Sequence, residues 1–429
     1  MKLKLNHKLK SGALQFTIFI SVLIALLLSG LLLYAYTFGY FKEQSKATIE
    51  NIQLSDTGIN YLLKQSEISS DTISLDLLKK ENQTIQVHVS PWGIFEKAFV
   101  KTQHRKKIFT KTAFIGTLFD AEESPTLYLQ ETYNPLTLVG NTKIKGKVFL
   151  PSQGVKPGYI AGQSYYGSQL IYGKIEKSGV NLPKLNKGNL EQLLVYIKSY
   201  KPANQTDFIS LESNKKVLNS FKQKTKNIYS PEPITLENVD VSGNIIIKSE
   251  TLIRIKKTAL LKEVLLIAPI IEIEEGTSGT FQAIASKKIN VGKDCKLYYP
   301  SALVLCEDNK DLNATPENRT DNQIFIDANT QINGCVCYFQ TKTFTSDFNT
   351  QIVTEEKSRI KGQVYCEGSF ELKGTVSGSV YTRQFIANQA GSVFVNHIYN
   401  GIIENTTISK LFGGILLENQ PKTIVKWLY

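Results

Sequence analysis

Residues that build common catalytic and metal sites are scarce in this sequence. Among 429 residues there are one Met, two Trp and four His, and the five cysteines form no CxxC pair. The chain has no GxxxxGK and no GxGxxG placed after a strand, so the usual phosphate-binding loops of nucleotide enzymes are missing. An odd number of cysteines also leaves at least one thiol outside any intramolecular disulfide.

The cysteines themselves do not form a metal motif. Cys335 and Cys337 lie two apart in a predicted strand, where their Cα atoms are about 6.5 to 7 Å apart, which suits a mutual disulfide poorly. Alternation along the strands points both outward and points Cys366 inward. Ligands on opposite sides of a sheet cannot share one ion, so we expect no metal site, and no motif indicates a cofactor.

Charge is absent between Lys10 and Lys42, and the stretch ALQFTIFISVLIALLLSGLLLYAY is apolar over about 24 residues. It predicts one transmembrane helix over 13–41 after a basic segment, 1–12. Lysines before the span favour an N-terminus in the cytoplasm and a C-terminal body outside the cytoplasmic membrane, in the periplasm or at the cell surface. A cleavable signal is the alternative, but its apolar core is shorter, about 7 to 15 residues, and ends at a small-x-small site.

The net charge of +12 comes from 50 Lys and Arg against 38 Asp and Glu, spread along the chain. A dispersed excess of this kind fits general solubility and weak attraction to anionic surfaces. Nucleic acid is therefore not an expected partner.

The N-terminus, LKSGALQFTIFISVLIALLLSG, resembles that of type IV pilin-like proteins, above all the minor pilins. The resemblance implies cleavage by a membrane peptidase after Gly12, so that the mature chain begins at Ala13. It also implies that the helix packs with those of other subunits. The fifth mature position is Thr17, where most members of the family have a glutamate and some minor, tip-located members do not.

Beyond the span, Ile49, Ile52, Ile59, Leu62 and Leu63 recur at helical spacing and predict a helical stalk over 42–80. Alternating runs then predict a small antiparallel β region over 81–150. The basic run from His104 to Lys107 falls between two of its strands, and we expect a solvated turn there.

A repeat with a period of about 18 residues begins near Leu252. It aligns Ile253, Ile271 and Ile289 in one column and places Ile255, Ile273 and Val291 in a second. This period matches the length of one coil of a β-solenoid, with three short strands and three turns. The two columns are predicted to form ladders in its core.

An aliphatic-x-Gly-x-aliphatic motif occurs five times, centred on Gly146, Gly243, Gly334, Gly362 and Gly378. On a strand, the glycine faces the same side as the two aliphatic residues, so it marks a place where inward volume is restricted. With the repeat blocks, the motifs resemble bactofilin-like polymer-forming domains. The resemblance implies a parallel β-solenoid over 234–405 that associates through its ends.

The segment 151–233 reads as an insertion with two helices, NLEQLLVYIKSY (189–200) and ESNKKVLNSFKQKTKNIY (212–229), placed to cover the open end of the solenoid. The last segment, 406–429, is expected to be a cap or tail.

Catalytic chemistry has little support in the sequence. His397 is a candidate general base of the kind used by trimeric acyltransferases with coils of the same length, but it stands alone. Glu272 and Glu274 are candidates for a glycan-cleaving site, yet alternation places them on the outer face, where charges are normally solvated. We therefore expect no enzyme and assign no catalytic residue.

The sequence thus predicts a mainly β, single-pass membrane protein that is a structural or assembly component of a bacterial cell envelope, such as a pilin-like subunit of a type IV pilus or a type II secretion-like apparatus. Its expected partners are the bilayer and other subunits, contacted through the N-terminal helix or the solenoid ends. Two alternatives stay open: a surface-anchored β-helix that binds or cleaves glycans, and an adhesin-like spacer without processing.

Overall fold

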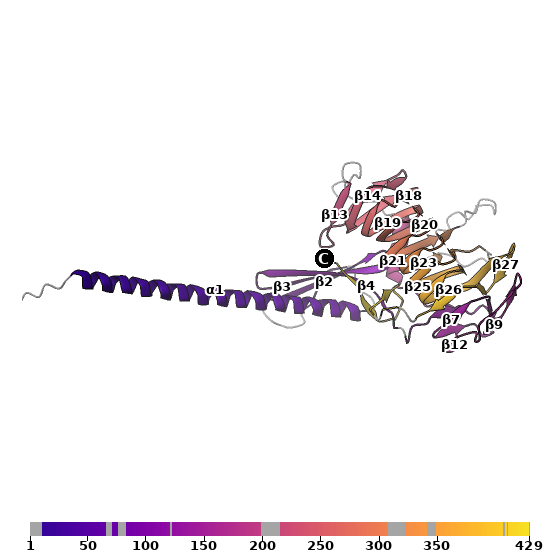
Figure 1. Cartoon of the computed structure of the whole chain (residues 1–429), viewed down its shortest axis with the longest axis horizontal. Helices are drawn as coiled ribbons and strands as arrows, with labels where there is room; N and C mark the ends of the chain where they lie inside the picture. Colours follow the sequence, from indigo (N-terminus) through magenta and orange to yellow (C-terminus); the bar gives the residue numbers. More distant parts are fainter. Residues whose placement is uncertain are drawn as a thin grey trace, which may run out of the picture.

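One long helix leads into a β-rich body (Figure 1). The computed structural model describes residues 11–65, 71–75, 83–120, 122–198, 215–307, 322–340, 349–405, 408–409 and 411–428. The prediction of a mainly β chain behind one long N-terminal helix is confirmed. The basic segment 1–10 lies outside the described residues.

Helix α1 (Ser11–Lys64) runs without a break through the predicted span and into the predicted stalk. Its 54 residues correspond to about 80 Å of helix. The stalk prediction is wrong at residues 73–75, which form strand β1 (Ile73–Leu75) and pair antiparallel with β2 (Gln83–Trp92). The rest of the predicted stalk, 66–70 and 76–80, lies outside the described residues.

An antiparallel sheet follows, in the order β1-β2-β3-β4-β30, with β31 also paired to β4. Its further strands are β2 (Gln83–Trp92), β3 (Phe95–His104), β4 (Lys107–Leu118), β30 (Gly413–Gly414) and β31 (Lys422–Leu428). Gly93 and Arg105, both at positive φ, form the tight turns of its hairpins. Residues 422–428 are therefore part of this sheet, and the prediction of a separate cap or tail is wrong for them.

The parallel sheet, here called the stack, forms the largest part of the body, and its strand pairings close on themselves. Its strands are β5 (Leu127–Leu129), β7 (Lys143–Lys145), β8 (Val148–Leu150), β12 (Ile175–Lys177), β13 (Lys216–Asn219), β14 (Lys226–Ser230), β15 (Ile234–Leu236), β16 (Asp240–Gly243), β17 (Ile245–Ser249), β18 (Leu252–Ile255), β19 (Leu260–Ile273), β20 (Ser278–Val291), β21 (Lys296–Glu307), β22 (Gln323–Ile326), β23 (Gln331–Gln340), β24 (Ile352–Thr354), β25 (Arg359–Leu372), β26 (Thr375–Gln389) and β29 (Ile402–Glu404).

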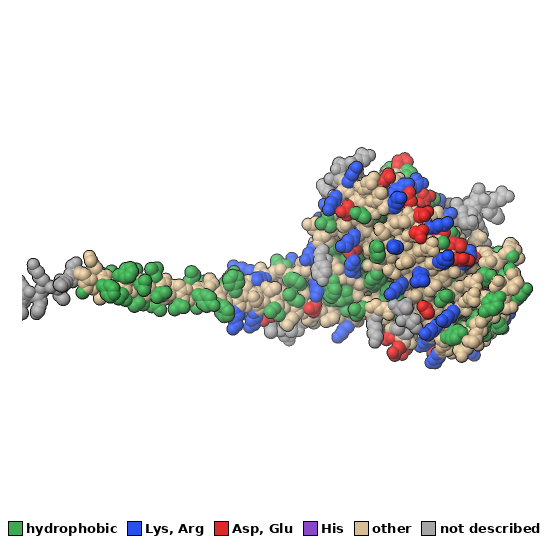
Figure 2. All heavy atoms as spheres, in the orientation of Figure 1, with side chains coloured by type: hydrophobic (Ala, Val, Ile, Leu, Met, Phe, Trp, Pro, Cys, Tyr) green, Lys and Arg blue, Asp and Glu red, His purple; other side chains and the backbone are tan. Residues whose placement is uncertain are grey.

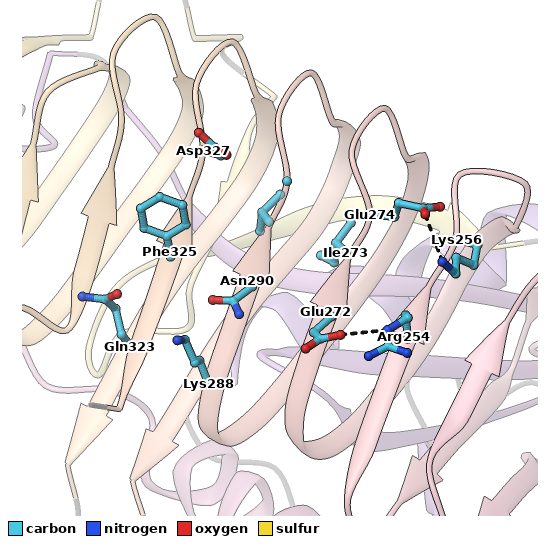
Figure 3. A pocket seen from close by; sticks show the side chains of 12 residues that line it. Arg254, Lys256, Glu272, Ile273, Glu274, Lys288, Asn290, Gln323, Phe325 and Asp327 are labelled. Carbon is cyan, nitrogen blue, oxygen red and sulfur yellow. Dashed lines mark hydrogen bonds and ion pairs between the residues drawn. The ribbon is translucent and has the colours of Figure 1, made fainter. Parts of the chain in front are cut away.

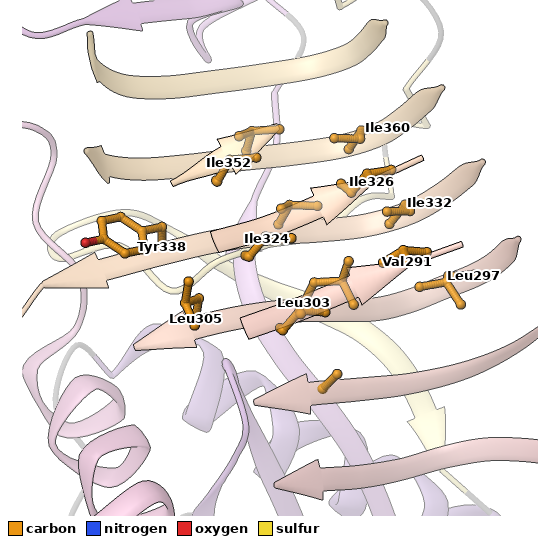
Figure 4. Packing of buried hydrophobic residues seen from close by; sticks show 14 of the residues in the cluster. Val291, Leu297, Leu303, Leu305, Ile324, Ile326, Ile332, Tyr338, Ile352 and Ile360 are labelled. Carbon is orange, nitrogen blue, oxygen red and sulfur yellow. The ribbon is translucent and has the colours of Figure 1, made fainter. Parts of the chain in front are cut away.

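Register in the stack follows the repeat seen in the sequence. Ile253 pairs with Ile271 and Ile271 with Ile289, while Ile255, Ile273 and Val291 align in the same way. These six side chains lie in one buried cluster, at most 3% exposed. Figure 4 shows how this column of aliphatic side chains continues through the later strands.

Where one turn of the stack pairs with the next along β19 and β20, the pairing has three straight runs. These are 261–262, 264–268 and 270–273, and the register shifts between them. Outward side chains of the middle run are covered by the antiparallel sheet and by helix α2 (Lys187–Lys198), and we call this side the covered face. Outward side chains of the third run, such as Arg254 and Glu272, are partly exposed, and we call this side the open face.

The motif glycines lie at the first of these bends. Gly334, Gly362 and Gly378 pair with one another in successive strands, each with φ near +150°. A Cβ on Gly362 would lie 1.8 Å from the carbonyl oxygen of Gly334. The glycine is therefore required by the backbone conformation and by the close approach of the preceding turn. Gly146 and Gly243 share the positive φ and the same lack of room.

Chain order in the stack differs from the prediction. Strands β5 and β7, within the predicted antiparallel region, pair in parallel with β26 and β29 near the C-terminus. The prediction of an antiparallel region is thus wrong for 127–150. Strands of three residues are too short for their sequence to indicate which distant strand they pair with. The far end of the stack is formed by β13, β14 and β15.

The segment 151–233 contains one helix within the described residues, α2 (Lys187–Lys198). The predicted second helix is wrong: residues 216–219 and 226–230 form β13 and β14, because pairing with β16 and β17 overrides a weak helical spacing. Helix α2 does not cover the end of the stack. Its Leu193 and Tyr196 are buried in the cluster at the covered face.

Small sheets complete the body. Strands β28 (His397–Tyr399), β6 (Leu136–Val139) and β9 (Val155–Pro157) form one of three strands, and β10 (Tyr159–Ile160) pairs with β11 (Gln163–Ser164). Strand β27 (Ser392–Val395) pairs antiparallel with β26.

Candidate functional site

The N-terminal half of α1 is apolar and stands free of the body. The side chains from Leu14 to Phe41 are exposed, and no other described helix is both long and apolar enough to cross a membrane (Figures 1 and 2). Gly12 and Ala13 lie at its exposed start, where a Cβ on Gly12 would have nothing within 4 Å. The Thr17 hydroxyl donates to the Leu14 carbonyl at 2.9 Å, within the same helix.

Aromatic side chains mark the end of the apolar run. Tyr34, Tyr36, Phe38, Tyr40 and Phe41 are each more than half exposed. Tyr and Trp gather at membrane–water interfaces, where the ring meets hydrocarbon and the polar atom meets water. The position of this group fits the boundary of a span.

The C-terminal half of α1 packs on one face of the antiparallel sheet. Leu54, Ile59 and Leu62 are buried against a cluster that includes Val87 and Val100. A Cβ on Gly58 would lie 2.7 Å from Val100 Cγ1, so helix and sheet are in close contact. The other face of the sheet packs on the stack, so the sheet lies between the C-terminal half of α1 and the stack.

The basic hairpin between β3 and β4 is docked on α1. His104 Nδ1 lies 2.9 Å from a Glu50 carboxylate oxygen, and Arg105 lies 3.4 Å from that of Glu43. The Lys107 ammonium donates to the Gln44 carbonyl at 3.2 Å. The expectation of a merely solvated turn is therefore wrong. Sequence spacing carried no signal for these helix partners.

The open face carries a ladder of charges (Figure 3). Arg254 pairs with Glu272 at 2.8 Å and Lys256 with Glu274 at 3.0 Å, so that each pair joins one turn of the stack to the next. Hydrogen bonding from the Lys257 amide, followed by that of Lys256, lowers the pKa of Glu274. A carboxylate in an ion pair with a lysine or arginine is stabilised in its charged form. Such a group does not suit the role of a general acid.

A shallow pocket lies beside this ladder. Its wall continues onto later turns through Lys288, Asn290, Gln323, Phe325 and Asp327. Amides, a carboxylate and a partly exposed ring are the groups that bind sugar hydroxyls and sugar faces.

His397 is half-buried at the start of β28. Its Nδ1 contacts the Val395 carbonyl at 2.7 Å and its ring lies 5.5 Å from that of Phe394. Burial lowers its pKa. Among the described residues, no group of three or more His, Cys, Asp and Glu side chains could hold a metal ion.

All five cysteines are buried, and none of them forms a disulfide. Cys335 and Cys337 belong to the covered-face cluster, while Cys366 belongs to the interior of the stack. Burial raises the pKa of Cys335 and of Cys366 to about 12, so these thiols are poor nucleophiles at neutral pH. Alternation along the strands predicted which side of the sheet each of these cysteines faces. It did not predict that the antiparallel sheet covers the outer side.

No protein-family model matches the chain, and no curated protein matches it. Among solved structures, the chain overlaps the competence-associated pilin ComZ from Thermus thermophilus with a TM-score of 0.23 and 9% sequence identity. The overlap covers 89% of this chain and 97% of that one. A TM-score this low does not demonstrate a common fold.

Proposed function

We propose that the chain is a non-enzymatic, membrane-anchored assembly subunit of the cell envelope, of the pilin-like type, whose stack is a β-solenoid held outside the cytoplasmic membrane. One observation carries the proposal: a single continuous helix whose first half is apolar and exposed and whose second half is buried against an antiparallel sheet. The part that anchors the chain and the part that packs on the body therefore belong to one helix, with no loop between them.

Physical chemistry limits what surrounds the exposed half. Leaving a large aliphatic or aromatic side chain in water costs about 1.5 to 3 kcal/mol relative to burial, and the exposed half carries a continuous series of them. A bilayer covers this surface, and so does a bundle of equivalent helices. The proposal requires a subunit that moves from the bilayer into such a bundle of helices. Gly12 is its processing site, and Thr17 lies on the surface that packs against the other helices.

The experiment is the N-terminal sequence of the protein isolated from its own cells, for the wild type and for Gly12→Val. A chain that begins at Ala13, with a longer product from Gly12→Val, supports the proposal. Gly30→Val is the matched control, because a Cβ on either glycine meets nothing within 4 Å, and it should still be processed. A wild-type chain that begins at Met1 refutes processing and leaves an anchored spacer.

Glycan binding at the open face is a second candidate, favoured by the pocket around Asn290 and Phe325. It predicts that wild-type protein is retained on purified cell-wall polysaccharide and that Asn290→Ala or Phe325→Ala is not. Retention unchanged in both variants would exclude this pocket.

A further inference from the structure

The tip of the β3–β4 hairpin lies where the apolar part of α1 ends. The strands run back along the helix toward its N-terminus, and Arg105 contacts Glu43 at 3.4 Å (Figure 1). Helical rise places Glu43 only about 3 Å beyond Phe41, the last residue of the apolar run. If α1 spans a bilayer as proposed above, the Arg105 side chain at the tip therefore reaches the headgroup layer, which is about 5 to 8 Å thick on each side.

Positive charge is concentrated at this level. Figure 2 shows Lys and Arg side chains gathered where the apolar part of the helix meets the body. The cations here are Lys42, Lys46, Arg105, Lys106 and Lys107, and the nearby carboxylates are Glu43 and Glu50. Among the described residues, Lys42, Lys46 and Lys106 have no ion-pair partner.

Apolar surface accompanies the charge. Ile108, two residues beyond Lys106, is 57% exposed, and Tyr40 and Phe41 are exposed at the end of the apolar run. Unpaired cations next to exposed apolar side chains are the combination that binds the surface of an anionic membrane: the cations meet phosphates and the apolar groups enter the acyl boundary.

From this geometry we infer that the hairpin tip, residues 105–108, docks on anionic phospholipid headgroups and orients the body on the membrane. The inference rests on the proposed membrane span. Hydrogen bonds fix the tip to the helix, since Asn51 donates to the Lys107 carbonyl and Thr102 donates to the Asn51 carbonyl, both at 3.2 Å. The helix and the tip therefore present to the membrane as one unit.

The test uses the full chain with Ile108→Cys, labelled with an environment-sensitive fluorophore. The five native thiols are buried, so the added cysteine is the reactive one. The labelled protein is placed in nanodiscs of phosphatidylcholine alone or of phosphatidylcholine mixed with phosphatidylglycerol. We expect blue-shifted emission in the anionic discs that returns to the neutral-disc value as salt is raised.

Charge variants sharpen the test. Arg105→Gln with Lys106→Gln should abolish the shift, and Lys106→Gln alone should reduce it while leaving the Arg105–Glu43 pair intact. Lys287→Gln with Lys293→Gln removes the same charge from an exposed part of the stack and should leave the shift unchanged. Circular dichroism checks that each variant is folded.

Three results would overturn the inference. Equal emission in neutral and anionic discs shows that the tip does not respond to lipid charge. A shift that depends on the number of chains per disc and not on the lipid assigns the surface to a neighbouring copy. Failure of the chain to enter discs removes the membrane span, and with it the proposed function, whereas entry without a lipid-dependent shift refutes this inference alone.

Discussion

The covered and open faces of the stack are built from the same repeat but carry opposite chemistry. On the covered face the outward side chains Leu265, Ile284 and Cys337 are fully buried. On the open face, Arg254 and Glu272 hold the corresponding outward positions of the third run and are about two-fifths exposed. The inward aliphatic ladders therefore set the fold, and the outward residues decide what docks on it.

The partner of the covered face is equally specialised. Trp92, Phe95 and Phe114 project from the antiparallel sheet into the same cluster, while alternate residues of those strands contact α1. One thin sheet thus has two apolar faces. The sheet therefore lies between α1 and the covered face of the stack. The open face remains exposed to other contacts.

The largest expected effect comes from placing a charge on the covered face. Leu265→Asp buries an unpaired carboxylate, and we expect a loss of about 5 kcal/mol in the free energy of unfolding, or failure to fold. Asn290→Asp on the open face should change it by less than about 0.5 kcal/mol. Urea denaturation of both variants measures the difference, and similar losses would contradict the distinction between the faces.

The bend that separates the faces is the next most sensitive place. Gly362→Ala sets a Cβ 1.8 Å from the Gly334 carbonyl oxygen at a φ of +150°. We expect a loss of about 3 to 4 kcal/mol, since backbone strain and a forced shift add together. Gly391→Ala shares a positive φ but has nothing within 4 Å, so it should cost about 1 kcal/mol in the same urea titration. Equal costs would show that crowding by the preceding turn is unimportant.

A gain is expected at Lys97, which lies on the same side of β3 as Phe95. Its ammonium is 5.2 Å from the Trp92 ring, and burial lowers its pKa from 10.5 to about 8. The unfolded chain therefore holds more protons between these values, and wild-type stability should rise from about pH 8 to 10.5. Lys97→Met should gain about 1 to 3 kcal/mol at pH 7 and lose that advantage as the pH approaches 10.5.

Thermal or urea unfolding at both pH values checks this prediction. Lys287→Met, on the exposed surface of the stack, is the control and should change stability by less than about 0.5 kcal/mol at either pH. A gain at Lys97 that does not vary with pH would mean that packing, and not charge burial, is responsible.

The smallest effect is expected for the ion pairs of the open face. A double-mutant cycle with Arg254→Gln and Glu272→Gln should give a coupling energy below about 1 kcal/mol, because water and salt screen both side chains. The coupling should fall further at high salt. A coupling of several kcal/mol would mean that the open face is more enclosed than its exposure indicates.

Much of the stack could be predicted because its signal repeats. The columns headed by Ile253 and Ile255 indicated the register directly, since each inward position recurs once in every repeat. Strand β13 was missed because Val217 and Phe221 also suit a helix, and pairing with β16 decided the outcome. No local pattern could link Leu127 to Val380, because their contact depends on tertiary structure alone.

The candidate site likewise has one part that the sequence predicts and one part that it does not. An uncharged run of this length is visible in any sequence, so the apolar half of α1 could be predicted, whereas Gly12 as a processing site stays a prediction. The contact of Arg105 with Glu43 joins residues 62 apart through two exposed side chains, and no periodicity reports it.

The order of strands also determines when the body can close during synthesis. Strands β5 and β7 are synthesised early, yet the strands with which they pair, β26 and β29, come only in the last part of the chain. Strand β4 likewise pairs with β31, which is synthesised about 300 residues later. The body therefore cannot close before these late strands are made, so a prematurely terminated chain has open strand edges that favour proteolysis or aggregation.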